Sequence, residues 1–451
     1  MKEMKILSPT GILGYGFPKE SFEKGMSMKP DAIAVDAGST DPGPYYLGAG
    51  VSFTDRASVK RDLEILIKGA LDNHIPLLVG TAGGSGADVH LKWCLDIVRE
   101  ITAGRDVKVA FISSEISREK AMEAFDKNEL MPLAAVPVIT RANIEDATRI
   151  VAQMGNAPFI KALDEGADIV IAGRAYDPAI FAALPVKEGY DPGLALHMGK
   201  ILECACIAAT PGSGSDCMMG CIGNDYFKVF PLNDKRKCTE LSVAAHTLYE
   251  KSDPYVLYGP DGVIDLTESS FEQLDGISVR VRGTKFIPSV KPMVKLEGAR
   301  SVGYRTVSIA GTRDPVMTGS IDSILDAVRE ATEDNFTGTI KGYDLSFKVY
   351  GKNGVMGELE PVKQTKSHEL GIIIDAVGAT QDEANTICSF ARSTLLHYGY
   401  PGRISTAGNL AFPYSPSDFK AGAVYEFCIY HLMPYEEGMF EVKWMGDDYE
   451  S

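Results

Sequence analysis

The sequence has no surplus of basic residues, and this absence limits its partners. Lys and Arg number 45 against 61 Asp and Glu, so the net charge is -16 at pH 7. A chain with this balance has little to offer the phosphate backbone of a nucleic acid, and we expect no nucleic-acid partner. The composition suits a soluble cytoplasmic protein, which is the location that we expect.

Cysteine is also scarce, and long apolar runs are missing. The 8 cysteines among 451 residues are too few for a disulfide scaffold, and a cytosolic setting would keep them reduced. No segment approaches the roughly 20 consecutive apolar residues that a spanning helix needs, so we expect no membrane partner. The segment 1–7 shows no apolar run before a cleavage site, and we expect no signal peptide.

The usual signatures of several enzyme classes are absent as well. The chain has no G-x-S-x-G and no H-E-x-x-H, so the serine hydrolase and zincin signatures are missing. Its main glycine-rich loop lacks the Gly-Lys-Ser/Thr ending of a Walker loop and the G-x-G-x-x-G spacing of a dinucleotide site.

What is present is enough for a folded protein of several parts. The hydrophobic share of 45% and the charged share of 24% are typical of globular domains, and 451 residues exceed one ordinary core. We expect an α/β ligand-binding domain over 1–190 and a second α/β or α+β region, packed on the first, over 191–337. A C-terminal α+β domain is expected over 338–451.

Strand-like and helix-like segments alternate in the first part of the chain. Short apolar runs predict strands at 31–36, 75–79, 107–113 and 168–172, and helical spacing predicts helices at 56–73, 88–101 and 144–154. This rhythm predicts an α/β fold with a mainly parallel open sheet and helices on both faces, followed by a smaller α+β domain. A TIM barrel is the alternative, which the irregular helix lengths disfavour.

The expected strand at 75–79 runs into a loop with glycines at 80, 83, 84 and 86, and a helix is expected from Asp88. Such a loop leaves bare backbone N–H groups at a helix N-terminus, where a phosphate or carboxylate binds. The candidate substrate-binding residues here are Thr81, Gly83, Gly84, Ser85 and Gly86. The alternative is a tight strand-to-helix turn without a ligand.

A second loop of small residues follows the expected strand at 31–36. Asp36 ends this strand, and Ser39, Thr40 and Asp41 follow it. In a parallel sheet both loops fall on the carboxyl edge, where open α/β sheets bind ligands. Asp36 and Asp41 are candidates for acid/base catalysis or for an oxygen-ligated metal. Ser39 and Thr40 are candidates for substrate binding, and a simple turn capped by Asp36 is the alternative.

Two further candidates belong to the same edge of the expected sheet. Arg174 follows the strand at 168–172 and can clamp a substrate carboxylate through two parallel hydrogen bonds. A salt bridge at the sheet edge is its alternative role. His90, on the first turn after the glycine-rich loop, is the best general-base candidate among the 7 histidines.

A cluster of cysteines lies near two more acidic residues. The cluster consists of Cys204, Cys206, Cys217 and Cys221. Its C-x-C and C-x-x-x-C spacings match neither a zinc ribbon nor a ferredoxin, and small buried hydrophobes are the alternative. Whether these residues hold a metal stays open, as does a divalent metal elsewhere. Glu203, in an apolar helix, and Asp216, after a glycine-rich break, are candidates for perturbed pKa values and for catalysis.

Several segments resemble the acyclic terpene utilisation (AtuA-like) family. They read GGSGADVHL at 83–91, IVIAGRAYD at 169–177, GKILEC at 199–204 and, more weakly, LYEKSDP at 248–254. The resemblance covers residues 1–335. After Cys204 the chain departs from the glycine-rich stretch of the family, so a shared substrate does not follow. The resemblance implies a catabolic, enzymatic role on a branched carboxylic acid or its thioester.

Two functions are compatible with these features. The first is a catabolic enzyme that acts on a small carboxylic acid or its acyl-CoA thioester, with lyase, hydratase or isomerase chemistry that abstracts a proton next to a carbonyl. Its candidate catalytic residues are Asp36, Asp41, His90, Glu203 and Asp216. The alternative is a non-catalytic ligand-binding or assembly subunit of a larger catabolic complex. For either, we expect a homo-oligomer, and a second small subunit is a further candidate partner.

Overall fold

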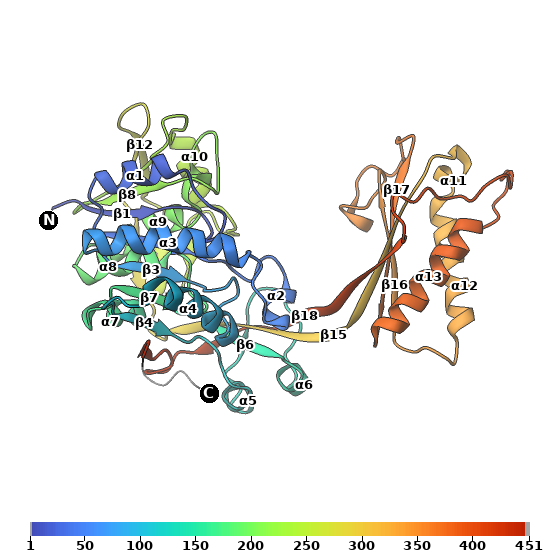
Figure 1. Cartoon of the computed structure of the whole chain (residues 1–451), viewed down its shortest axis with the longest axis horizontal. Coiled ribbons are helices and arrows are strands. Elements are labelled where there is room, and N and C mark those ends of the chain that lie inside the picture. The colour runs from blue at the N-terminus through green and yellow to red at the C-terminus, as the bar shows by residue number, and fades with distance from the viewer. Residues whose placement is uncertain (1, 447–451) are drawn as a thin grey trace. The chain divides into compact units, whose positions relative to one another are not determined.

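The computed structural model describes residues 2–446, and the chain divides into two compact units (Figure 1). Unit 1 contains Met1–Arg300 and Phe427–Ser451, and unit 2 contains Ser301–Glu426. The strands β15 (Met293–Thr312) and β18 (Asp418–Pro434) contribute residues to both units. The boundaries expected after residues 190 and 337 differ from this division. The expected division into 1–190, 191–337 and 338–451 stays a prediction.

The centre of unit 1 is a sheet of parallel strands. In spatial order these are β1 (Met4–Ser8), β2 (Ala32–Asp36), β3 (Leu77–Gly80), β7 (Ile169–Ala172) and β4 (Val109–Ile112). Every residue of β2, β3, β4 and β7 is buried, as in parallel strands that helices cover on both faces. The strands expected from apolar runs are therefore present, with bounds shifted by a few residues.

Antiparallel strands extend this sheet on both sides, so the whole sheet is mixed. Beyond β1 lie β8 (Met218–Ile222), β9 (Phe227–Pro231), β13 (Val279–Arg282) and β12 (Ser270–Gln273), and β19 (Val442–Trp444) pairs with β4. The expectation of a mainly parallel sheet therefore holds only for the centre. Short connections explain why the outer strands are antiparallel. Strands joined by a tight hairpin, as β8 and β9 are, must run antiparallel. The described sheet ends in β12 and β19, so it is open and not a TIM barrel.

Hydrophobic cores lie on both faces of the sheet, since alternate strand residues point to opposite sides. The helices that build them are α3 (Arg56–Asn73) and α4 (Asp88–Thr102) for one core, and α7 (Ala157–Asp164), α8 (Ala179–Lys187) and α9 (Pro192–Leu202) for the other. Within β3, Val79 belongs to the first core and its neighbour Leu78 to the second. Helices on both faces are thus confirmed, as are the helices expected at 56–73 and 88–101.

The remaining elements of unit 1 are short. The helices are α1 (Lys19–Ser27), α2 (Pro44–Ala49), α5 (Arg118–Asp126), α6 (Arg141–Glu145), α10 (Glu240–Thr247) and the 3-10 turn η1 (Ala205–Ala208). The strands are β5 (Met131–Pro132), β6 (Arg149–Ala152), β10 (Val256–Tyr258), β11 (Gly262–Asp265) and β14 (Lys285–Pro288). The helix expected at 144–154 is wrong, because α6 ends at Glu145 and β6 pairs with β15.

Unit 2 combines an antiparallel sheet with helices. Its elements include β16 (Asp344–Tyr350), β17 (Leu370–Gly378), α11 (Pro315–Gly319), α12 (Ile321–Phe336), α13 (Gln381–His397) and the turn η2 (Gly357–Leu359). Strand β17 pairs with both β15 and β16, and its Ile372 and Ile374 share a core with Ile324 of α12 and Ile387 of α13. Among residues 2–446, no helix is long and apolar enough to cross a membrane.

The parallel centre of unit 1 brings distant loops to one edge. Strand β2 ends in Asp36, β3 in Gly80 and β7 in Ala172. Because these strands are parallel, the loops that follow them leave the sheet on the same side. The Thr81 N–H donates a hydrogen bond to the Gly173 carbonyl at 2.9 Å, which ties two of these loops together. The loops singled out in the sequence therefore share the carboxyl edge.

Candidate functional site

A cavity of ≈ 210 Å³ lies at this edge of unit 1 and is rich in carboxylates. The acidic residues that line it are Asp36, Asp41, Asp177, Glu203 and Glu250. They come from the loops after β2 and β7, the end of α9 and the segment after α10. Of the residues expected at a site, the cavity brings together Asp36, Ser39, Asp41 and Glu203.

Asp36 is a buried acid with an unused oxygen. As the last residue of β2 it is 7% exposed, and its Oδ1 has no hydrogen-bond partner. Burial raises the pKa of Asp36 well above its usual range, the negative charge of Asp177 raises it further, and Arg174 opposes the shift. The carboxyl is therefore held in its protonated form beyond the pH at which an exposed aspartate ionises.

Glu203 is the second buried acid of the cavity. It follows the last residue of α9 and is 5% exposed; its Oε1 is ion-paired with Lys200, and its Oε2 has no partner. Burial raises the pKa of Glu203 to about 7, although the Lys200 ammonium lowers it, and Asp177 adds to the rise. An acid with this pKa exists in both protonation states near neutral pH, as a general acid or base requires.

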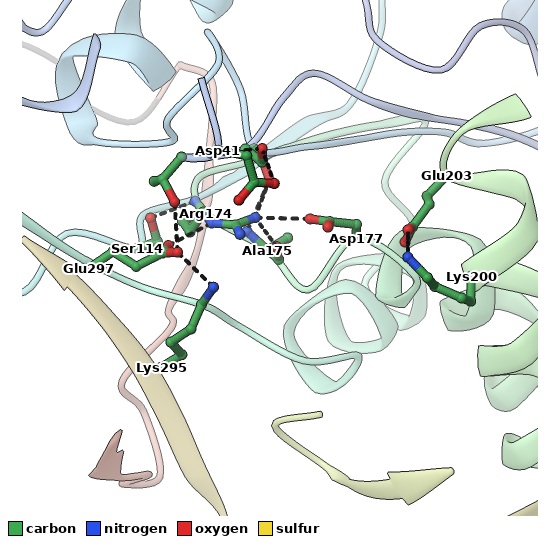
Figure 2. A network of polar contacts seen from close by, with 12 residues as sticks. Asp41, Ser114, Arg174, Ala175, Asp177, Lys200, Glu203, Lys295 and Glu297 are labelled. Atoms are coloured by element: carbon green, nitrogen blue, oxygen red, sulfur yellow. Dashed lines mark hydrogen bonds and ion pairs between the residues drawn. The ribbon is translucent and has the colours of Figure 1, made fainter. Parts of the chain in front are cut away.

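Figure 2 shows a polar network built on Arg174 in the loop after β7. The Arg174 Nε donates to Glu297 Oε2 at 2.8 Å, and its Nη1 donates to Asp177 Oδ1 at 2.9 Å. Glu297 lies in β15, where its Oε1 accepts from Lys295 Nζ and from Thr40 Oγ1, each at 2.7 Å. Burial alone would raise the pKa of Glu297, but Arg174 and Lys295 hold it at about 2.

This network determines what Arg174 does in the described structure. Its Nη1 also donates to the Ala175 carbonyl at 2.7 Å and lies 3.4 Å from Thr81 Oγ1. These contacts support the alternative role of Arg174, an ion pair at the sheet edge, and the substrate clamp stays a prediction. The network fixes the position of Asp177, which lines the cavity and raises the pKa of Asp36.

The glycine-rich loop after β3 is closely packed against its neighbours. The Gly84 N–H donates to the Thr81 carbonyl at 3.1 Å and the Gly86 N–H to the Ala82 carbonyl at 3.2 Å, so neither amide is bare. Both glycines have positive φ, 99° and 72°. A Cβ on Gly84 would lie 2.5 Å from Phe53 Cδ1. The tight turn is therefore the role that these contacts support.

The other candidates of this loop lie outside the cavity lining. Gly83 has positive φ, and a Cβ there would lie 2.7 Å from the Cβ of His90. Ser85 is buried, and its Oγ has no hydrogen-bond partner. Neither residue lines the cavity, and neither do Gly84 and Gly86. Anion binding by this loop stays a prediction without a supporting contact.

His90 is buried and its two ring nitrogens are engaged. The Nδ1 accepts from the Ala87 N–H at 3.2 Å, and the Nε2 lies 3.1 Å from the Tyr46 carbonyl and 3.2 Å from that of Val51. Burial lowers the pKa of His90 to about 4, so the ring is neutral at pH 7. It supports the first turn of α4, and it is not among the cavity-lining residues.

Asp41 and Asp216 differ in their surroundings. Asp41 lines the cavity at an exposed position, where its Oδ2 accepts from Ser39 Oγ at 2.8 Å. Asp216 is 1% exposed and does not line the cavity. Its Oδ2 accepts from Arg236 Nε at 2.7 Å and from Asn233 Nδ2 at 2.8 Å. Those contacts give Asp216 a structural role in the loop before β8.

The cysteines do not form a metal site in the described part of the chain. Residues 2–446 contain no group of three or more His, Cys, Asp or Glu side chains that could hold a metal ion. Cys206 Sγ donates to the Cys217 carbonyl at 3.1 Å, and Cys217 and Cys221 belong to a hydrophobic core. Cys204 lines the cavity, and burial raises the pKa of its thiol.

Sequence reasoning missed several charged residues of this site. Those are Asp177, Lys200, Lys251, Lys295 and Glu297. The spacing of Lys200 and Glu203 on α9, three positions apart, is a signal that could have revealed their ion pair. Lys295 lies two positions from its partner Glu297 on β15, but no local signal links Glu297 to Arg174 and Thr40, which lie on other elements of unit 1.

The fold and the site together define an α/β protein with an acidic cavity at the carboxyl edge of its parallel strands. The sequence family described as "Acyclic terpene utilisation family protein AtuA" matches residues 56–216 and 232–416, and the chain belongs to this family. The resemblance in the sequence is thereby confirmed, and it extends beyond residue 335. Asp36 and Asp41 lie before the matched residues. Comparison with curated proteins and comparison with solved structures each gave no significant match.

Proposed function

We propose that this protein is a catabolic enzyme that abstracts a proton next to the carbonyl of a small carboxylic acid or its acyl-CoA thioester. The reaction belongs to the lyase, hydratase or isomerase class. One observation carries the proposal: Asp36 and Glu203 line the same cavity, and each has a raised pKa and an oxygen without a partner. Strongly perturbed acids that share a cleft are typical of catalytic sites.

The two acids take different roles in the proposed reaction. The ionised carboxylate of Glu203 removes the proton, and the electron pair left on carbon moves to the carbonyl oxygen. The protonated carboxyl of Asp36 donates a hydrogen bond to that oxygen and stabilises the enolate. In an isomerase the proton on Glu203 returns to another carbon; in a dehydratase it leaves with the hydroxyl group as water.

The surrounding charges support this division of roles. Lys200 holds one oxygen of Glu203 and lowers its pKa, which keeps the carboxylate partly ionised near neutral pH. Asp177 raises the pKa of both acids, and the Arg174–Glu297 network fixes Asp177 beside them. The preorganised charges therefore need no rearrangement when the enolate forms.

The family name and the cavity size indicate the substrate class. The name supports a place in the catabolism of acyclic terpenes, whose carbon chains are branched. The cavity of ≈ 210 Å³ is smaller than the roughly 300–1,000 Å³ of pockets that enclose drug-sized ligands. It therefore suits a short acid or the acyl end of a thioester, with the CoA part outside.

Location and assembly complete the proposal. We place the protein in the cytoplasm as a homo-oligomer, with a second small subunit as a candidate partner. The acidic composition and the absence of a spanning helix among residues 2–446 are compatible with this location. Native mass spectrometry of the purified protein gives the oligomeric state and reveals any bound subunit or metal.

Proton abstraction is tested by exchange in D2O. The protein is incubated with branched enoic acids, hydroxy acids and their CoA thioesters, and NMR follows the signal of the proton next to the carbonyl. We expect exchange with the wild type and a loss of about 100-fold or more in Glu203→Gln and Asp36→Asn. Glu129→Gln, at an exposed position that is not part of the cavity lining, is the control.

Each outcome of this experiment decides between the two functions. Absence of exchange with every compound, with or without a divalent metal or a partner subunit, contradicts the proposed reaction. Binding of a compound without exchange supports instead a non-catalytic ligand-binding or assembly subunit of a larger complex.

A further inference from the structure

Buried side-chain atoms without a hydrogen-bond partner gather in and beside the cavity. In the described part of the chain these include Asp36 Oδ1, Glu203 Oε2, Tyr176 OH and His246 Nε2. Each of the four residues is at most 7% exposed. Because buried polar atoms in folded proteins nearly always have a partner, this concentration indicates a ligand that supplies the missing contacts.

Tyr176 and His246 extend the site beyond the two acids. Tyr176 precedes Asp177 in the loop after β7, and burial and then the charge of Glu203 raise the pKa of its hydroxyl. The His246 ring stacks on Tyr249, which lines the cavity, with 5.2 Å between the ring centroids. Neither residue is in the cavity lining itself. Tyr176 offers a neutral polar atom that interacts with Glu203, and His246 offers one on a ring that contacts the lining residue Tyr249.

Lys251 is the cation that belongs to this group. Its ammonium lies 5.8 Å from the centre of the Tyr176 ring, and it interacts electrostatically with Glu203 and Asp177. Within residues 2–446, no carboxylate lies at ion-pair distance from Lys251. Burial, and next the charge of Lys200, lower the pKa of Lys251. A half-buried ammonium without a counter-ion is a site for an anion.

The ion pairs of the cluster leave one of its cations without a carboxylate partner. Its cations are Arg174, Lys200, Lys251 and Lys295; its carboxylates are Asp36, Asp177, Glu203 and Glu297, and Asp41 and Glu250 also line the cavity. Glu297 is ionised, but Asp36 and Glu203 have raised pKa values and remain partly neutral. Arg174 and Lys295 are neutralised by Glu297 and Asp177, and Lys200 by Glu203. Lys251 is left to bind the ligand.

We propose that Lys251, whose ammonium lies 5.8 Å from the centre of the Tyr176 ring, binds a free carboxylate of the substrate next to the Asp36–Glu203 pair. This subsite rests on the proposed function, since it names the substrate class of the same cavity. The substrate is then an acid that keeps a free carboxylate when it reacts. A thioester is accepted only if it carries a second carboxylate.

The experiment compares a carboxylate with its neutral amide. Isothermal calorimetry measures the binding of isovalerate and isovaleramide to the wild type, to Lys251→Met and to Lys251→Arg. A charge-assisted hydrogen bond changes affinity by about tenfold or more. We therefore expect Lys251→Met to lose at least that factor for isovalerate and nothing for isovaleramide, and Lys251→Arg to retain most of the affinity. Lys235→Met, at an exposed position, is the matched control.

Labelling of the wild type gives a second measurement that does not depend on the folding of a variant. Reductive methylation of lysines is followed by peptide mass spectrometry with isovalerate or isovaleramide present. Protection of Lys251 by isovalerate alone supports the subsite. Equal labelling of Lys251 with both compounds overturns it, as does equal affinity of the wild type and Lys251→Met, or a wild type that binds no isovalerate.

Failure of the subsite and failure of the proposed reaction are distinguishable. Carboxylate binding that depends on Lys251, in a protein that exchanges no proton, leaves the subsite standing and contradicts the reaction. Proton exchange that depends on Asp36 and Glu203, together with carboxylate binding that is unchanged in Lys251→Met, supports the reaction and contradicts the subsite.

Discussion

Arg174 and Glu297 form a buried ion pair across 123 positions of sequence, with 2.8 Å between Nε and Oε2. Arg174 lies in the loop after β7, whereas Glu297 lies in β15, opposite Val151 of β6. The two residues are 2% and 0% exposed, so water solvates neither charge. The pair therefore ties the carboxyl edge of the sheet to β15 and holds the wall of the cavity in place.

Removal of the charge at Glu297 is expected to destabilise the fold strongly. In Glu297→Gln, the buried Arg174 keeps only Asp177 as a counter-ion and the partly exposed Lys295 loses its carboxylate partner, which costs about 3–5 kcal/mol of the free energy of unfolding. Urea denaturation followed by circular dichroism measures this loss. The control is Glu23→Gln, which breaks the exposed i,i+4 pair with Lys19 and should cost less than about 1 kcal/mol. Similar losses in both variants would contradict the prediction.

His197 is expected to lower stability as the pH falls. Its Nδ1 and Nε2 lie 2.7 Å from Thr284 Oγ1 and 2.9 Å from Thr247 Oγ1, and burial lowers its pKa from 6.5 to about 3. The unfolded chain takes up this proton below pH 6.5, whereas the folded chain takes it up only near pH 3. The free energy of unfolding therefore decreases over that interval. Urea titrations at several pH values should show that the free energy of unfolding decreases less with falling pH in His197→Gln than in the wild type. The same decrease in both proteins would mean that another group causes it.

Gly86→Ala is expected to destabilise the protein more than Gly104→Ala does. Both glycines have positive φ, 72° and 76°, so a side chain causes similar backbone strain at the two positions. A Cβ on Gly86 would lie 2.1 Å from the Arg174 backbone nitrogen, whereas nothing lies within 4 Å at Gly104. We expect about 1 kcal/mol for Gly104→Ala and about 3 kcal/mol for Gly86→Ala, measured by urea denaturation. Equal losses would mean that the clash is relieved without cost.

The central strands and helices could be predicted because their signals are local. The structure of residues 144–154 could not, because their spacing predicts a helix where the fold has the strand β6. Thr140 and Asn143 form a capping box that begins α6, but Ile150 and Val151 pair with Gly298 and Glu297 of β15. A strand partner far away in the sequence therefore decides the structure of this segment, and local helical spacing does not reveal it.

The site shows the same limit. Asp36 and Glu203 could be singled out from their places at a strand end and in an apolar helix. Glu297 could not. The pattern of polar and apolar residues along a strand does not reveal that a buried glutamate pairs with Arg174, which is far away in the sequence. For the glycine-rich loop, the contacts of Gly84 and Gly86 support close packing, and anion binding stays a prediction. A sequence does not distinguish the close approach of another segment from that of a ligand.

The pH dependence of turnover tests the role of Glu203. Burial raises its pKa to about 7 against the attraction of Lys200. If the ionised form is the base, the exchange rate in D2O rises with an inflection near pH 7, and it falls where Asp36 loses the proton that it donates to the enolate oxygen. Lys200→Met removes the attraction that lowers this pKa, so the inflection should move to higher pH, whereas Lys127→Met, at an exposed position, should leave it in place. An inflection that stays the same in Lys200→Met would show that another group is the base.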